Sequence, residues 1–144
     1  QEGLGSSYLH IELSGDYFWD LCKIRAFKIL FHKSLTKAAN KNFFLIVGES
    51  IAFNDIVNKP QNQWLDLTTI AMSATQSGCD GFWMKNIDYQ NDNADNLSQR
   101  LSRNVYNILN EESYLTDVHD PGAGSYFIEN YTHAIAKAIF NRIP

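Results

Sequence analysis

The chain has 144 residues, of which 44% are hydrophobic and 13% aromatic, a composition that suits one globular domain spanning residues 1–144. Twelve basic residues against 16 acidic ones give a net charge of −4, which argues against binding to nucleic acid. The longest apolar stretches are too short to predict a membrane span. The chain begins QEGLGSS, with no initiator methionine and no secretory signal, and we expect a cytoplasmic fragment of a longer protein.

The first half of the chain predicts two strands, each followed by a helix. In residues 6–15 apolar and polar side chains alternate, as in a strand, and Asp16 is expected to cap a helix over 17–37. A second strand is predicted over 42–50, apolar on both faces, as is typical of a strand covered by helices. A helix over 62–78, ended by Gly78, follows it. The apolar stripe of the first helix consists of Phe18, Leu21, Cys22, Ile29 and Leu30.

The second half adds a third strand over 79–87 and a third helix over 94–113. A turn at 120–122 then leads into a last helix over 126–142, while 51–61 and 88–93 are predicted loops. Three consecutive βα units predict a parallel sheet in an α/β fold, either an open doubly wound sheet or a closed barrel. Neither GxGxxG nor a P-loop follows the first strand, which lowers the expectation of a dinucleotide site.

Basic residues and cysteines give no sign of a binding site. The widest basic cluster follows helical periodicity and is interpreted as a solvated helix face; it comprises Lys23, Arg25, Lys28, Lys33 and Lys37. Cys22 and Cys79 lie in apolar segments and are expected to be buried, reduced thiols. The histidines at 10, 32, 119 and 133 lack metal-ligand spacing. Met72 and Trp64 are expected in the core.

Residues 111–133, EESYLTDVHDPGAGSYFIENYTH, concentrate reactive residue types. Glu111 and Glu112 diverge by about 100° on a helix, so they close the third helix more readily than they share a substrate, with one of them paired to Arg103 or capping a neighbouring turn. His119 and Asp120 could form a base and its orienter, but Asp120 before a proline favours turn initiation.

The glycines of the same stretch offer a second functional reading. Gly122 and Gly124 could cradle a phosphate at the start of the last helix, yet no lysine accompanies them. We interpret the stretch as a turn in which the Ser125 hydroxyl caps the helix and Glu129 lies one turn further on. We therefore assign no catalytic, cofactor-binding or metal-binding residue to the chain.

Several motifs resemble those of the methylmalonyl-CoA mutase family. GDYFWDLCKIRAFKIL at 15–30 is similar to that family's Tyr-Phe and Lys-x-Arg-Ala helix entry, and TTIAMSATQSGCD at 68–80 to its Thr-Thr-x-Ala-Met-Ser-Ala helix. The run at 100–136 resembles its Arg-x-x-Arg-Asn, Glu-Glu-Ser, Asp-Pro-x-x-Gly-Ser-Tyr and Glu-x-x-Thr series. The resemblance implies that the three βα units and C-terminal helix are the C-terminal portion of a TIM-type (β/α)8 barrel that holds acyl-CoA.

The same resemblance implies where this chain departs from the catalytic members. Their His-x-Gln pair corresponds here to Val47 and Glu49, and an arginine before the Thr-Thr run corresponds to Asp66. Bulky side chains at 82–84 would obstruct a pantetheine tunnel along the barrel axis if they faced it. We expect the non-catalytic small-subunit type, which supports a catalytic large subunit in a heterodimer.

Adenosylcobalamin is implied for the family's holoenzyme, but the cobalamin signature Asp-x-His-x-x-Gly is absent from this sequence, and we expect the chain to bind neither cobalamin nor acyl-CoA. Two alternatives remain open. One is an active mutase chain acting on another branched acyl-CoA, with Glu49 and Lys85 as polar contacts; the other is a self-sufficient α/β domain of unrelated function. Because three strands cannot close a barrel, we expect self-association through an inner face that carries Phe43 or Phe44 and Phe82 or Trp83.

Overall fold

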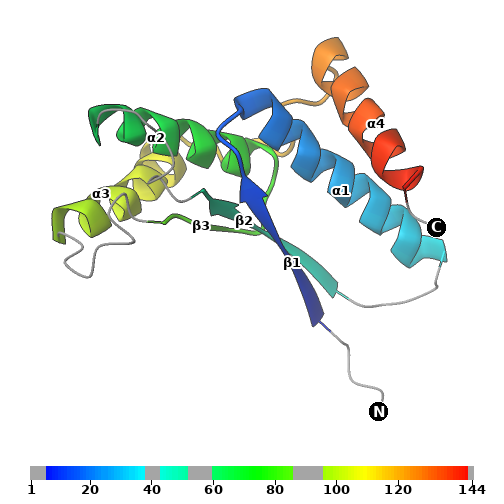
Figure 1. The fold of residues 1–144 in the computed structure, drawn as a ribbon, viewed down its shortest axis with the longest axis horizontal. Coiled ribbons are helices and arrows are strands. Elements are labelled where there is room, and N and C mark those ends of the chain that lie inside the picture. The colour runs from blue at the N-terminus through cyan, green and yellow to red at the C-terminus, as the bar shows by residue number, and fades with distance from the viewer. Residues whose placement is uncertain (1–5, 38–42, 52–59, 86–95, 143–144) are drawn as a thin grey trace.

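The computed structural model describes residues 6–37, 43–51, 60–85 and 96–142 (Figure 1). Strands and helices alternate in the predicted order. They are β1 (Ser6–Leu13), α1 (Tyr17–Lys37), β2 (Phe43–Ser50), α2 (Pro60–Gln76), β3 (Gly81–Trp83), α3 (Asn96–Asn107), the π-helical turn η2 (Ile108–Glu112) and α4 (Tyr126–Phe140). The chain therefore has the predicted α/β organisation.

The three strands form one parallel sheet in the order β1-β2-β3. Ser6 pairs with Phe43 and Leu13 with Ser50, so β1 and β2 run side by side over their full length. β3 is shorter than the predicted strand over 79–87, and residues 86 and 87 lie outside the described residues. Sequential parallel order is compatible with a section of either a barrel or an open sheet.

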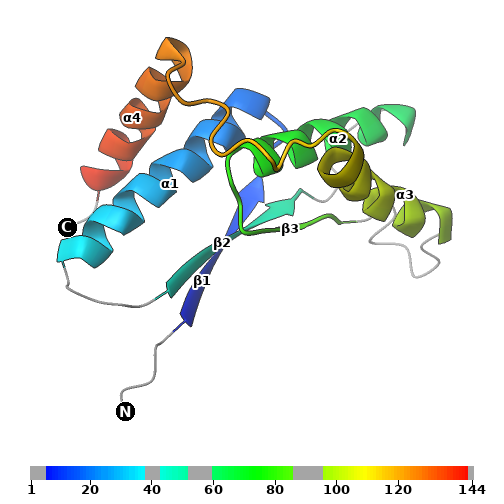
Figure 2. The same cartoon turned by 180° about the vertical axis from the view of Figure 1, so that it is seen from behind.

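The helices lie on one side of the sheet (Figures 1 and 2). Alternate strand residues turn toward α1 and α2 and form the main core, with Ile11, Leu13 and Ile46 packed against Ile24, Leu67, Ile70 and Ala74. The opposite face is open, and Tyr8 and Trp83 on it are 69% and 58% exposed. We call this side, with Tyr8, His10, Glu12, Leu45, Val47, Glu49, Trp83 and Lys85, the open face. The second strand, predicted to be covered by helices, is covered by them on one face in the described part of the chain.

Helix α1 is covered on two sides, because α4 packs on it from outside (Figure 1). Leu21, Cys22 and Ala26 meet Ile135 and Ala136 in a second core cluster. Phe18, predicted in the apolar stripe, is instead 47% exposed and touches Phe127 edge-on at a centroid distance of 5.2 Å. The prediction for Phe18 was wrong because helical periodicity assigns a single apolar face, whereas α1 packs against the sheet on one side and α4 on another.

The helix ends follow the sequence signals. The Trp19 backbone N donates to Asp16 Oδ1 at 3.0 Å, which is the predicted N-cap. Gly78 ends α2 with φ +74°, and the backbone N of Cys79 donates to the Ala74 carbonyl at 3.2 Å. The third helix ends as an α-helix at Asn107 and continues as η2, one residue short of the predicted boundary at 113.

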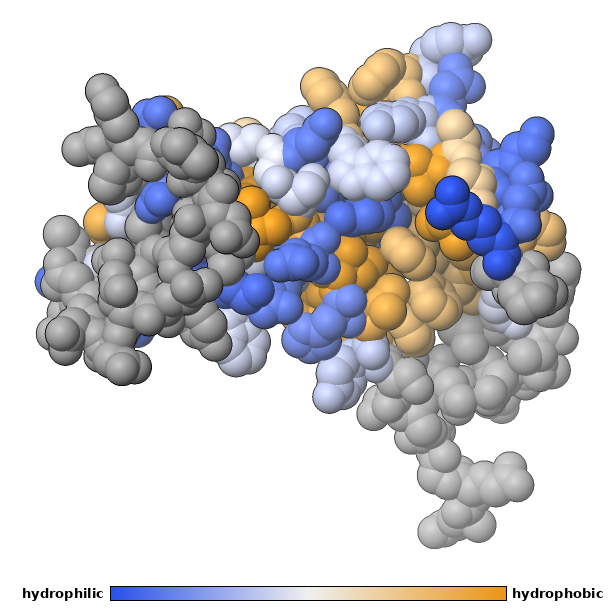
Figure 3. Space-filling view, viewed as in Figure 1, coloured by the Kyte–Doolittle hydropathy of each residue, from blue (hydrophilic) through white to orange (hydrophobic). Residues whose placement is uncertain are grey.

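Figure 3 shows hydrophobic side chains reaching the surface between polar ones on the face seen in Figure 1. Trp64 and Met72, expected in the core, are only half-buried, although Trp64 packs at the edge of the main core. Within the described residues no helix has both the length and the apolar character needed to cross a membrane.

Candidate functional site at the strand ends

Charged side chains meet at the carboxyl ends of the three strands. Glu12 of β1 and Glu49 of β2 are register partners, so their carboxylates project from neighbouring strands on the open face. Lys85, two residues after β3, places its ammonium 3.3 Å from Glu49 Oε1 and 3.6 Å from Glu12 Oε1. We call these three residues the strand-end cluster. In parallel α/β folds this is the edge at which catalytic and binding groups gather.

Lys85 is held where it can bridge the two carboxylates. Its backbone N donates to the Oγ of Ser50 at 2.8 Å, and Ser50 is fully buried. The Lys85 side chain is 17% exposed, against 31% for Glu49 and 62% for Glu12. Two like charges opposite each other on neighbouring strands repel, and the ammonium between them offsets that repulsion. The charged groups of the strand-end cluster are therefore paired mainly with one another.

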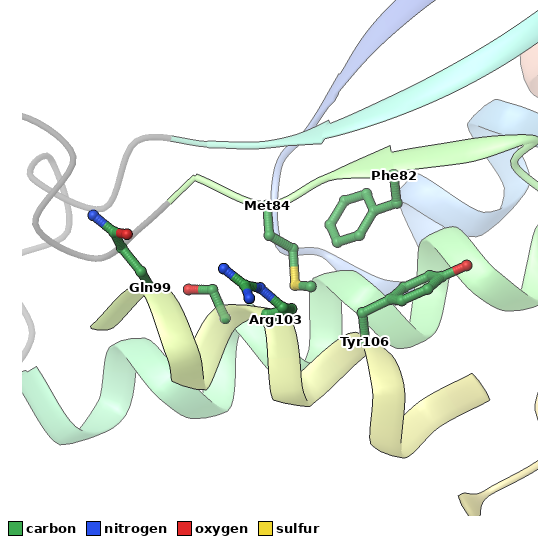
Figure 4. A pocket seen from close by; sticks show the side chains of 6 residues that line it. Phe82, Met84, Gln99, Arg103 and Tyr106 are labelled. Carbon is green, nitrogen blue, oxygen red and sulfur yellow. The ribbon is translucent and has the colours of Figure 1, made fainter. Parts of the chain in front are cut away.

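The rest of the open face is bulky. Trp83 lies beside Glu49 in register, and His10 meets the Tyr8 ring edge-on at 5.5 Å. Phe82 and Met84 point the other way, toward α3 (Figure 4). Phe44 also faces the helices, since its ring stacks on Phe31 of α1 at 4.0 Å. Of the aromatic residues expected on an inner face, the structure therefore places Trp83 on the open face and Phe44 and Phe82 on the helix side.

The turn from β1 into α1 is held by a carboxylate that sequence reasoning missed. Asp20 is fully buried and accepts hydrogen bonds from the backbone N of Ser14 at 3.0 Å and of Gly15 at 2.9 Å. Lys23 Nζ lies 3.1 Å from Asp20 Oδ1 and donates to the Glu12 carbonyl at 2.7 Å. An aspartate within an otherwise apolar helix turn was the available signal. This bonding fixes the backbone next to Glu12.

Arg25 contradicts the interpretation of the basic cluster as a solvated face. It is 8% exposed, and its Nη2 donates to Glu129 Oε1 at 2.8 Å. Its Nη1 lies 2.9 Å from Asp120 Oδ1, in an ion pair that lacks hydrogen-bond geometry. Lys28 likewise turns inward and donates to the Gly78 carbonyl. The prediction failed because α4 and residues 113–125 cover the part of α1 that periodicity alone assigns to solvent.

Within residues 111–125, Asp120 forms an ion pair with Arg25. Glu111 and Glu112 are exposed in η2, and among the described residues neither forms an ion pair with Arg103. Asp120 has φ +52° and turns its carboxylate to Arg25, while His119 stays exposed beside it. His119 and Asp120 are thus not joined as a base and its orienter.

The start of α4 differs from the predicted cap. Ser125 occupies the N-cap position, but its hydroxyl makes no capping bond; its carbonyl accepts from the Glu129 backbone N at 2.9 Å. Instead the Glu129 carboxylate reaches back to the Gly124 backbone N at 3.3 Å. A Cβ on Gly122 would lie 2.9 Å from Arg25 Nη1, so this glycine permits the close approach of the guanidinium.

The described histidines and cysteines form no metal site. His10 and His133 lie on β1 and α4, and no group of three metal-ligating side chains comes together in the described part of the chain. Cys22 and Cys79 are free thiols, as predicted; Cys22 is buried and Cys79 half-buried. Burial raises the pKa of Cys22, and it raises the pKa of Cys79 from 9.0 to about 11, so neither is poised as a nucleophile.

The sequence profile of the methylmalonyl-CoA mutase family matches residues 8–144. The chain belongs to this family. A methylmalonyl-CoA mutase small subunit from Porphyromonas gingivalis is 28% identical over 135 residues, which are 87% of this chain and 21% of that protein. A probable methylmalonyl-CoA mutase large subunit from Mycobacterium bovis is 26% identical over 130 residues, 85% of this chain and 17% of its own length.

A methylmalonyl-CoA mutase homolog from Alkalihalophilus pseudofirmus is 28% identical over 117 residues, and the match covers 80% of each chain. This mutase family member therefore spans about a fifth of the two subunits above and most of the shorter homolog. Similarity to both small and large subunits means that the comparisons assign the family without assigning the subunit type.

Because the chain belongs to the mutase family, residues on its open face can be compared with the family's motifs. Val47 and Glu49, which correspond to the His-x-Gln pair of the resemblance, both lie on this face, two residues apart on β2. Asp66 lies half-buried on α2. Glu12 and the bridging role of Lys85 were not predicted, because pairing across strands depends on a register that local sequence does not reveal.

Proposed function

We propose that this chain is the later part of the acyl-CoA barrel of a mutase-like protein of the non-catalytic, small-subunit type, which supports a catalytic large subunit. In such a barrel the helices form the outer layer and the open face looks toward the axis. The sequential strand order and the placement of the helices on one face support this reading.

The observation that carries the proposal is the composition of the open face. An acyl-CoA arm along the axis needs small polar side chains on the strands, since a barrel of this size is otherwise filled by its own residues. Here the strand ends carry Glu12, Glu49 and Lys85, closed on one another by ion pairs of 3.3 and 3.6 Å, with Trp83 alongside. Glu49 would also place a negative charge where donation to a thioester carbonyl is required.

The surroundings of His119 and His133 do not favour a role for either residue in holding adenosylcobalamin, the cofactor of the family. A side chain that holds the cobalt would be a histidine in an open site. His119 instead lines a cavity of about 400 Å3 that also contains Arg25 and Asp120, which are committed to each other. His133 is bonded to the Glu129 carbonyl at 2.8 Å. We therefore propose that cobalamin contacts in the holoenzyme come from other parts of the assembly.

An active chain with a different branched acyl-CoA substrate is the second candidate. Lys85 favours it, because an ammonium held at the strand ends can donate to a thioester carbonyl. The two candidates differ in what the strand-end cluster does during turnover.

The test is mutase turnover of the natural assembly that contains this chain, with Glu49→Gln or Lys85→Met. A supporting subunit predicts turnover within about twofold of wild type once assembly is verified by size-exclusion chromatography. A loss of mutase turnover of about a hundredfold or more in an intact assembly would contradict the supporting role and favour the active-chain alternative. Arg100→Gln, an exposed change on α3, is the matched control.

A further inference from the structure

A groove separates β3 from α3 on the helix side of the sheet, away from the open face. Its volume is about 380 Å3, within the usual range of small-molecule sites. The lining residues are Phe82, Met84, Gln99, Ser102, Arg103 and Tyr106. Phe82 and Met84 point from the strand side toward α3, and Arg103 and Tyr106 project from α3 to either side beneath them (Figure 4).

The groove exists because α3 rests on α2 rather than closing fully over β3. One wall is apolar and adaptable, since Met84 has a flexible, polarisable thioether beside the Phe82 ring. Tyr106, 40% exposed, adds a second aromatic ring on the opposite wall. An apolar body of modest thickness is the shape that these two walls accommodate.

The polar groups of the groove are not used within the described structure. Arg103 is exposed and forms no ion pair with any described residue, although Glu111 and Glu112 follow on the same helical segment. Ser102 is only 3% exposed, and its Oγ has no hydrogen-bond partner in the described part of the chain. Buried hydroxyls nearly always have a partner, so an unpaired one in the wall of a groove marks a place where a ligand atom can supply it.

We propose that this groove binds a small organic carboxylate whose body is aromatic or otherwise apolar. The guanidinium of Arg103 presents a planar pair of donors that matches a carboxylate, and it is the one cation among the lining residues, which suits a monoanion. The apolar body lies between Met84 and Phe82 on one side and Tyr106 on the other. Gln99 adds an amide at the rim. The site is separate from the strand-end cluster and does not depend on the proposed function.

The experiment is a titration of the natural polypeptide, labelled with 13C at the methionine methyl groups, with 3-phenylpropionate. This sequence contains two methionines, so Met84 reports the groove while Met72 on α2 serves as an internal control. Met84→Leu identifies the reporter signal. We expect a saturable shift of Met84 and none of Met72. The uncharged 3-phenylpropionamide should bind at least tenfold more weakly.

Arg103→Gln and Arg100→Gln form a matched pair, since both arginines are exposed on α3 and only Arg103 lines the groove. Arg103→Gln should weaken 3-phenylpropionate binding at least tenfold with an unchanged circular dichroism spectrum, and Arg100→Gln by less than twofold. The proposal is overturned if Met84 shows no saturable shift, if acid and amide bind equally, or if the two variants lose the same affinity. None of these readouts involves mutase activity, so a failure here is distinguishable from a failure of the proposed function.

Discussion

The guanidinium of Arg25 on α1 lies 2.8 Å from the carboxylate of Glu129 on α4, 104 residues further along the chain. Asp120 holds the other side of the same guanidinium at 2.9 Å. Arg25 thus joins the inner helix layer, the outer helix and the segment that connects α3 to α4. A single planar cation with several donors can serve two carboxylates in this way, whereas a lysine cannot do so with the same geometry.

Replacing Arg25 by Met should lower the free energy of unfolding by about 1–3 kcal/mol, because the guanidinium is buried while both carboxylates keep partial contact with water. Arg25→Lys should recover only part of the loss. Urea unfolding followed by circular dichroism measures both. The control is Arg100→Gln, for which we expect less than about 0.5 kcal/mol. An Arg25→Met variant as stable as this control would remove the structural role assigned to the ion pairs.

Substitution of Gly122 should destabilise the fold more than substitution of the nearby, exposed His119. A Cβ at Gly122 would meet Arg25 Nη1 at 2.9 Å and Ile128 at 3.2 Å, so Gly122→Val should destabilise the fold by more than about 1 kcal/mol. Gly124 has φ +79° and open space around it, so Gly124→Val should act through backbone strain alone. His119→Ala should change the melting temperature little. If His119→Ala proves the costlier change in thermal melts, the interpretation of this turn as scaffolding is wrong.

The order and type of the helices and strands could be predicted because each depends on local signals. Alternation in β1, the Asp16 cap and the terminating Gly78 are all properties of neighbouring residues. Which side of a helix or strand is covered by other elements was harder to predict. Phe18 was expected to be buried and is exposed, whereas Arg25 was expected to be exposed and is buried. The helix that packs on α1 is α4, which lies more than 100 residues further along the chain, so local periodicity could not reveal the contact.

The candidate site was only partly predictable for a similar reason. Glu49 could be singled out from the family resemblance, and Lys85 as a polar neighbour. Their ion pair, and the inclusion of Glu12, depend on the parallel register of the strands. That register is set by packing on the helices, which a reading of single segments does not supply.

Stability should fall between pH 9 and pH 11 because of Cys79. Burial raises the pKa of this thiol to about 11 from 9.0, so the folded chain favours the neutral form. The resulting stabilisation is complete below the unfolded pKa and is lost as pH rises through the folded one, by about 1–3 kcal/mol in total. Urea unfolding at pH 8.5 and 10.5 should show a larger loss for wild type than for Cys79→Ala. Equal losses would contradict the assignment.

The chain on its own should self-associate, with symmetric dimers as the expected form. β1 and β3 are edge strands of the described sheet, and Tyr8 and Trp83 expose aromatic surface on its open face. Trp83→Lys should shift light scattering toward monomer across a concentration series. Phe44→Lys is not an equivalent variant, since Phe44 stacks on Phe31 in the helix layer and its loss should unfold the chain. A wild-type chain that stays monomeric at high concentration would contradict this prediction.

We propose that the open face of this chain has no channel for an acyl-CoA ester. Calorimetric titration of methylmalonyl-CoA into the isolated natural polypeptide that carries this chain tests it most directly, with Trp83→Ala and Glu49→Gln alongside. The bulky Trp83 and the ion-paired Glu12, Glu49 and Lys85 predict no saturable heat for the wild-type chain. Tight 1:1 binding by wild type that Glu49→Gln abolishes would contradict the account and establish the strand ends as a substrate site.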